Sequence, residues 1–339
     1  MIRRPLPRLL IITILICLVV WLAYRLGPRH DIVEPRAPPT IPADAFALEA
    51  KLAESERRID QSNFGPITPG TEKRIFWAHA DRRKTAFSVV YLHGYSATRQ
   101  EVSPLTEQLA AHLGANLFHT RLSGHGQPGE AMASARADDW LADTLEAYAI
   151  GEQIGERVIV VGTSTGGTLA LWLARRPEAA NLAALLLVSP NLGPRDPRSE
   201  WLKEPWGEQL AAAVIGPTYE WRPANEAHAK FWSWRYPSSA LIPMMALVDY
   251  VRSSDLEFVT TPTLVIYSNR DRVVSHEQIE TMFNRLGRDA SSLPIKRSIV
   301  MDRSEDPSHH VLAGDVLAPN DTARVLRHMQ DFLDSLHER

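Results

Sequence analysis

The chain has 339 residues and a formal net charge of −3, and 45% of its residues are hydrophobic. This composition excludes a nucleic-acid binder that works through a basic surface, and the length suits one large domain with an insertion and a tail. The single cysteine, Cys17, excludes disulfides within the chain. The sequence contains no glycine-rich phosphate loop and no metal-ligand spacing, so we expect neither a cofactor nor a metal.

The first predicted element is an apolar run from Leu9 to Tyr24, interrupted only by Thr13. At about 1.5 Å per residue the run is slightly shorter than a hydrocarbon core of ~30 Å, and flanking arginines can reach the headgroups. We predict an uncleaved single membrane anchor over residues 1–27, with a cleaved signal peptide as the alternative. More arginines precede the run than follow it, which predicts a bacterial inner-membrane protein with a periplasmic catalytic domain. The arginines are Arg3, Arg4, Arg8, Arg25 and Arg29.

Residues 28–70 predict a proline-rich stalk and a flanking helix. Five prolines between Pro28 and Pro42 favour an extended segment. Apolar residues at helical spacing predict a helix over Ala43–Ile59, and the first strand is expected over Thr71–Ala78. The catalytic core is predicted to occupy residues 71–192 and 259–339, with a cap inserted over residues 193–258.

The most informative motif is Gly-Thr-Ser-Thr-Gly at 162–166, between the apolar strand Val158–Val161 and a helical run. A G-x-S-x-G turn between a strand and a helix holds its serine on a strained backbone and exposes the hydroxyl above the sheet. Glycine is needed on both sides because a side chain there would collide with neighbouring backbone. Ser164 is therefore the candidate nucleophile.

A serine nucleophile needs an acid and a histidine, which in this architecture follow it in that order along the chain. Asp271 lies in a polar turn after the apolar strand Thr263–Tyr267. Asp271 is therefore the candidate acid. Asp302 and Asp306 are alternatives, but both lie too close in sequence to the histidines to match the expected order.

The candidate base is one of two adjacent histidines. Pro294–Met301 alternates weakly and predicts a strand, and His309 and His310 follow it. Neighbouring histidines point in different directions, so they form a poor pair of metal ligands. A histidine after a late strand and before the terminal helix is where the base is expected.

A long insertion separates the strands Leu182–Val188 and Thr263–Tyr267. It spans about seventy residues, more than a simple crossover needs. It contains five of the chain's nine tryptophans and two helical runs, Gly207–Val214 and Ala240–Val251. We expect a helical cap with most of these tryptophans in its core.

Several segments together resemble the α/β-hydrolase superfamily, in its lid-bearing branch of carboxylesterases, monoacylglycerol lipases and lysophospholipases. The resemblance covers Thr71–Leu336, with a poorer match in the cap, and implies an α/β-hydrolase fold, a mostly parallel central sheet flanked by helices. The segments that carry it, besides the serine motif, are Val89–Ser96, Arg121–Gly126, Asp138–Trp140 and Ser308–Leu312.

The resemblance also implies roles for single residues. It makes His310 the base, since His309 stands where the family usually has glycine. The N–H groups of Thr165, next to the nucleophile, and of Tyr95, after His93-Gly94, are expected to form the oxyanion hole. His93 and His125 are expected to be structural.

The resulting prediction is a serine hydrolase that cleaves carboxylic esters, such as lysophospholipids or monoacylglycerols, through Ser164, Asp271, His310 and an acyl-enzyme. Two alternatives remain open. One is a proline-iminopeptidase-like peptidase, disfavoured by Thr163 and Thr165 beside the nucleophile; the other is a non-catalytic hydrolase-like binding module. The expected partners are a lipid or small ester and the membrane, with no nucleic acid and no obligate protein partner.

Overall fold

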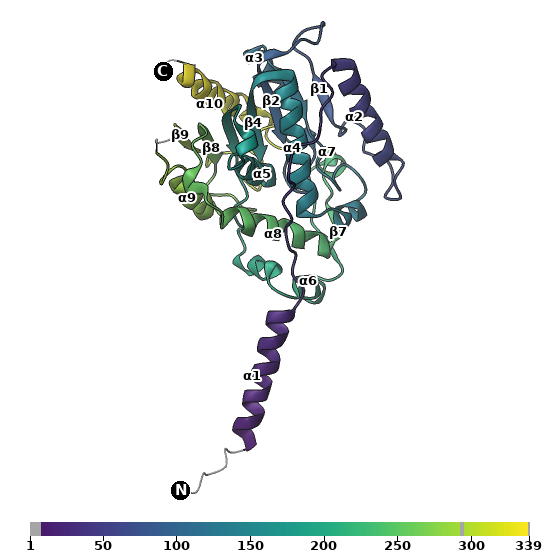
Figure 1. Ribbon diagram of the computed structural model, residues 1–339, viewed down its shortest axis with the longest axis vertical. Coiled ribbons are helices and arrows are strands. Elements are labelled where there is room, and N and C mark those ends of the chain that lie inside the picture. Colours follow the sequence, from purple (N-terminus) through teal and green to yellow (C-terminus); the bar gives the residue numbers. More distant parts are fainter. Residues whose placement is uncertain (1–7, 292–294, 338–339) are drawn as a thin grey trace.

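The computed structural model describes residues 8–291 and 295–337. Its centre is a seven-stranded sheet in the order β1-β3-β2-β4-β5-β8-β9 (Figure 1). β1 runs antiparallel to β3, and the other neighbouring strands pair in parallel. The strands are β1 (Arg74–Phe76), β2 (Thr85–Leu92), β3 (Asn116–His119), β4 (Gly155–Thr163), β5 (Leu182–Val188), β8 (Thr263–Tyr267) and β9 (Lys296–Val300).

The central strands are apolar on both faces because helices cover both faces. Val158 and Val160 of β4 pack into one buried cluster, whereas Ile159 and Val161 pack into the other. Alternate side chains of a strand point to opposite faces, so a strand buried on both sides reads as a continuous apolar run. The first cluster lies under α4 (Ala137–Ile154), α5 (Thr165–Leu173) and α9 (His276–Arg285), and the second under α3 (Leu105–Leu113) and α10 (Pro319–His337).

The predicted fold class, a mostly parallel sheet flanked by helices, is confirmed. The predicted strands Leu182–Val188 and Thr263–Tyr267 coincide with β5 and β8. The expected first strand is shorter than predicted, because only Arg74–Phe76 pairs with β3. Pro294, the start of the predicted late strand, lies outside the described residues.

The insertion forms a cap of helices and one small sheet. Its helices are η4 (Pro197–Lys203), α6 (Gly207–Val214), α7 (Glu226–Phe231), η5 (Ser238–Ala240), α8 (Leu241–Arg252) and η6 (Leu256–Phe258). Two strands, β6 (Thr218–Glu220) and β7 (Arg235–Pro237), pair antiparallel, which the expectation of an all-helical cap missed. They are only three residues long, too short for an alternating sequence pattern to reveal.

The N-terminal helix α1 (Arg8–Leu26) projects away from the cap end of the molecule (Figure 1). Within the residues that the structure describes, no helix is both long enough and apolar enough to cross a membrane. The transmembrane anchor predicted over residues 1–27 therefore has no support from the structure. Arg3 and Arg4, on which its orientation depends, lie outside the described residues.

Residues 28–44, which we call the N-terminal strap, lie along the body between α1 and α2 (Ala45–Asp60) (Figure 1). The carboxylate of Glu34 accepts hydrogen bonds from Trp172 Nε1 of α5 at 2.8 Å and from Tyr250 OH of α8 at 2.5 Å. It also pairs with Arg176 at 2.5 Å. The proline-rich segment predicted as a stalk is thus bound to both the core and the cap.

Candidate active site

Ser164 lies at the turn between β4 and α5, with φ 52° and ψ −119°. A Cβ on Gly166 would stand 1.9 Å from the carbonyl oxygen of Leu92, and one on Gly162 would stand 2.6 Å from that of Gly166. Both positions therefore need glycine, for the reason that the sequence predicts. The N–H of Ser164 donates to Val188 O at 2.9 Å, which ties this strained residue to the end of β5.

Asp271 and His310 lie together at the same edge of the sheet, after β8 and β9. His310 Nδ1 is 2.8 Å from Asp271 Oδ2, and both side chains are buried. The other oxygen of Asp271 accepts the N–H groups of Val273 and Val274 at 2.7 and 2.9 Å, which fixes the carboxylate. An Nδ1–H that donates to the carboxylate leaves Nε2 of His310 as the acceptor, the tautomer that a general base requires.

The other two aspartates near the histidines have different partners. Asp302 accepts hydrogen bonds from Asn269 and Ser268. Asp306 Oδ2 accepts the backbone N–H of His310 at 2.9 Å, so it shapes the histidine loop and does not orient the imidazole. Of the three aspartates, Asp271 is the one bonded to the ring.

His309 occupies a position with φ 53°, in the left-handed region where glycine is favoured. This backbone conformation explains why the resembling family has glycine there. Its buried Nδ1 has no hydrogen-bond partner among the described residues. His310, and not His309, therefore has the contact expected of the base.

The pKa of His310 is raised above its ordinary value. Burial alone would lower this pKa, but the charge of Asp271 and its hydrogen bond favour the imidazolium and outweigh burial. Within the described part of the chain, no hydrogen bond joins Ser164 to His310. Such a contact is often loose without substrate and tightens when substrate binds.

The N–H groups of Tyr95 and Thr165 have no acceptor among the residues that the structure describes. Thr165 opens α5, so its N–H belongs to the positive end of the helix. Tyr95 follows the loop held by His93, whose Nε2 accepts the N–H of Leu122 at 3.0 Å. Two free N–H groups at this edge of the sheet are the donors that an oxyanion needs.

His93 and His125 are fully buried, with structural contacts. The ring Nδ1 of His93 lies 2.9 Å from Gly94 O, and that of His125 lies 3.0 Å from Ser123 O. Burial lowers the pKa of His125 to about 4 and that of His93 well below its usual value. Both rings are therefore neutral supports of their loops, as predicted.

The cap contacts the loops on which the candidate residues lie. Tyr95 OH donates to Ala240 O at 2.7 Å, and Ser233 N–H donates to Ser96 O at 2.7 Å. Trp232 of the cap packs with Val311, next to His310, in a small buried cluster. The cap tryptophans differ in burial. Trp232 is buried, whereas Trp201 and Trp206 are exposed, although the sequence predicts core positions for most of them.

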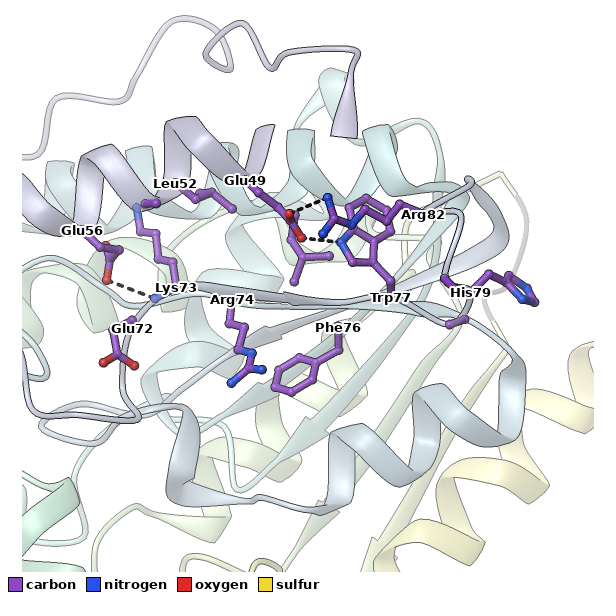
Figure 2. A pocket seen from close by; sticks show the side chains of 14 residues that line it. Glu49, Leu52, Glu56, Glu72, Lys73, Arg74, Phe76, Trp77, His79 and Arg82 are labelled. Atoms are coloured by element: carbon purple, nitrogen blue, oxygen red, sulfur yellow. Dashed lines mark hydrogen bonds and ion pairs between the residues drawn. The ribbon is translucent and has the colours of Figure 1, made fainter. Parts of the chain in front are cut away.

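A cavity of about 780 Å³ opens elsewhere, between α2 and β1 (Figure 2). Its charged groups already have partners. Glu49 accepts a hydrogen bond from Trp77 Nε1 at 2.7 Å and pairs with Arg82 at 3.0 Å, and Glu56 accepts the N–H of Lys73 (Figure 2). None of the candidate catalytic residues lines this cavity, so we do not assign it to catalysis. Among the described residues, no cluster of histidine, cysteine and acidic side chains could hold a metal ion.

Comparison with known proteins places these features in context. The model of the alpha/beta hydrolase family matches residues 89–325. A thermostable monoacylglycerol lipase from Bacillus sp. (strain H-257) is 27% identical over 209 residues, covering 58% of this chain and 74% of that protein.

Solved structures show the same fold at low sequence identity. A metagenome-derived lipolytic enzyme has a TM-score of 0.63 and 22% identity, covering 79% of this chain and 99% of its own. A monoacylglycerol lipase from Paleococcus ferrophilus has a TM-score of 0.58 and 15% identity, covering 78% of this chain and 98% of its own. A monoglyceride lipase from Saccharomyces cerevisiae has a TM-score of 0.53 and 13% identity, covering 78% and 91%.

Proposed function

The chain belongs to the alpha/beta hydrolase family, and on that premise we propose that it is a serine hydrolase that cleaves fatty-acyl esters such as monoacylglycerols or lysophospholipids. It is a lipase- and esterase-type hydrolase that acts on esters. The observation that carries the proposed mechanism is the 2.8 Å contact between Asp271 and His310, at the sheet edge where the strained Ser164 stands.

The proposed reaction has two stages, acylation of Ser164 and hydrolysis of the acyl-enzyme. His310 Nε2 takes the proton of Ser164 Oγ as the oxygen attacks the ester carbonyl, and the carbonyl oxygen becomes an oxyanion facing the N–H groups of Tyr95 and Thr165. The intermediate collapses to an acyl-enzyme while His310 returns its proton to the leaving alcohol. A water molecule then attacks the acyl-enzyme while His310 Nε2 takes one of its protons, and collapse of this second intermediate releases the fatty acid as His310 returns the proton to Ser164 Oγ.

We expect kcat/KM to rise from acetyl to medium-chain esters. An apolar acyl site gains up to ~0.8 kcal/mol per buried methylene, which is three- to fourfold per carbon until the site is full. Support comes from the similarity to a monoacylglycerol lipase and from the apolar cap that contacts the candidate site. The measurement is kcat/KM on p-nitrophenyl esters from acetate to decanoate, with aminoacyl amides as the control series. An optimum at acetate, or a preference for the amides, contradicts the lipid-ester proposal.

We also propose that α1 attaches the enzyme to a lipid surface, with the body on the periplasmic side of a bacterial inner membrane. α1 exposes apolar side chains around its surface, such as Val19 and Val20. Its end is bound to the cap, because Trp206 Nε1 donates to Ala23 O at 2.9 Å and Tyr24 OH donates to Glu204 at 2.7 Å. Further apolar residues of the cap are exposed: Trp201, Leu210, Val214 and Ile215. Together these surfaces would face one lipid layer.

Removing residues 1–27 is expected to release the protein from membranes without loss of esterase activity, because the strap and every candidate catalytic residue remain. Full-length protein should sediment with membranes, whereas the shortened protein should stay in the supernatant. As a matched comparison, removal of residues 1–36 also deletes Glu34 and should lower Tm, since Trp172 and Tyr250 lose their acceptor. Full-length protein that stays in the supernatant contradicts the attachment, and a mature N-terminus near residue 25 indicates a cleaved signal peptide.

A further inference from the structure

Glu101 is a buried carboxylate beside the candidate oxyanion hole that the proposed reaction does not use. It ends the short helix η1 (Arg99–Glu101) and is 2% exposed. Its Oε2 accepts the N–H of Gly94 at 2.7 Å and the hydroxyl of Tyr91 at 2.8 Å. A buried carboxylate is costly unless it is hydrogen-bonded, so both bonds help to hold it in this position.

The carboxylate stands close to the nucleophile. A Cβ placed on Gly94 would lie 2.6 Å from Glu101 Oε1 and 3.2 Å from Ser164 Cβ, so both side chains lie next to Gly94. The hydroxyl of Tyr91 also lies 3.1 Å from Thr163 Oγ1, on the residue before Ser164. Glu101 is therefore part of a buried network that joins the oxyanion loop to the nucleophile strand.

The network fixes the backbone that carries the N–H of Tyr95. The carbonyl of Gly94 belongs to the same peptide group as that N–H, and it accepts the N–H of Ala97 at 3.2 Å and faces His93 Nδ1 at 2.9 Å. Glu101 holds the preceding peptide of Gly94 through its N–H. The peptide before the donor and the donor's own peptide are thus both restrained, which is how a preorganised hole keeps its geometry.

We propose that Glu101 is a positioning residue that orients the Tyr95 N–H for transition-state stabilisation by bonding the Gly94 N–H through Oε2. This inference rests on the serine-hydrolase function proposed above. An ionised carboxylate would oppose the negative charge that develops on the acyl oxygen. Burial raises the pKa of Glu101 more than the hydrogen bonds from Gly94 and Tyr91 lower it, which favours the neutral form.

The variants follow from the geometry. Both donors point to the same oxygen, so the single carbonyl oxygen of Glu101→Gln can accept both and should retain kcat within about fivefold. Glu101→Ala removes the acceptor, and Glu101→Asp withdraws it by one methylene from Gly94 N–H. Each of these two should lower kcat by about 10²-fold with KM within twofold, the usual effect of losing one oxyanion donor. Glu101→Asp keeps the test valid if the alanine variant does not fold.

The matched control is Glu107→Ala, because Glu107 is a partly buried carboxylate of α3 that bonds Ser103 and Thr106 away from the oxyanion loop. All variants are assayed on p-nitrophenyl butyrate, with rates referred to the active fraction that a fluorophosphonate titrates. Butylboronic acid, which forms a tetrahedral adduct with a serine, should bind the alanine and aspartate variants about 10²-fold more weakly, whereas the control should match wild type.

Three outcomes overturn the proposal. In the first, Glu101→Ala and Glu101→Asp keep wild-type kcat per active site. In the second, kcat falls as far in Glu101→Gln as in Glu101→Ala, which would show that the oxygen that accepts the Gly94 N–H does not determine the rate. In the third, kcat falls but the affinity for butylboronic acid does not. If the wild-type enzyme turns over no ester, the proposed function is wrong and this inference is wrong with it. If the wild-type enzyme is active and one of the three outcomes is seen, only the role of Glu101 is wrong.

Discussion

Replacing Ser164 by alanine is expected to lower kcat on p-nitrophenyl butyrate by about 10⁶-fold, the loss seen when a serine nucleophile is removed from an intact triad. Tm should stay close to wild type, because the strain at this position belongs to the backbone with its φ of 52° and not to the hydroxyl. Labelling by a fluorophosphonate should disappear in parallel. These measurements test the nucleophile and separate an enzyme from a binding module.

Ser189→Ala is the matched control for this prediction. Ser189 directly follows the neighbouring strand β5, is buried and also has a positive φ, of 43°. Its Oγ has no hydrogen-bond partner among the described residues. Activity should therefore survive its removal. Comparable turnover in folded Ser164→Ala enzyme would remove Ser164 from the mechanism.

Replacing Asp271 by asparagine is expected to lower kcat by about 10⁴-fold, because the histidine loses the partner that fixes its tautomer and stabilises its imidazolium. The pH profile supplies a second readout. Only the neutral imidazole acts as base, so kcat/KM should rise with pH through the pKa of His310, which is raised above its ordinary value in the wild-type enzyme. In the asparagine variant burial remains, whereas the largest raising contributions, the charge of Asp271 and its hydrogen bond as a carboxylate, are gone, so the inflection should move to lower pH.

The two histidines provide the control for the base. His310→Ala should abolish turnover, whereas His309→Gly should retain it, because glycine adopts a φ of 53° without strain. The rates of both variants are measured on the same ester across pH 5–9. A larger loss in His309→Gly than in His310→Ala would make His309 the base, and an unchanged inflection in Asp271→Asn would remove Asp271 from its role.

The sheet and the placement of the candidate site could be predicted from sequence because they depend on local patterns in chain order. β5 and β8 are short apolar runs bounded by polar turns, and a strand before and a helix after Ser164 identify its turn. Asp271 was found because a polar turn follows its own strand. The catalytic roles of these residues remain predictions until the variants above are measured.

Other features depend on contacts between segments that are far apart in the sequence. Glu101 has no motif of its own, and its hydrogen bond with the Gly94 N–H, on which its proposed role rests, forms only because the loop after β2 folds back. The proline content predicts that the strap is extended but does not predict what it packs against. Its partners, such as Trp172, lie more than 100 residues away in the sequence. The exposure of Trp201 and Trp206 likewise depends on which side chains of the cap pack against the rest of the protein, which a local sequence pattern does not show.

Because the strap is bound to the body, the body cannot move freely relative to α1. If the seventeen residues of the strap were a free chain, their root-mean-square end-to-end distance would be about 20 Å, and the body could take many orientations relative to α1. With Glu34 held by α5 and α8, that freedom is lost. Where α1 is held at a lipid layer, the cap stays at a fixed height above it. Encounter with substrate then becomes a search in two dimensions, governed by lateral diffusion within the layer.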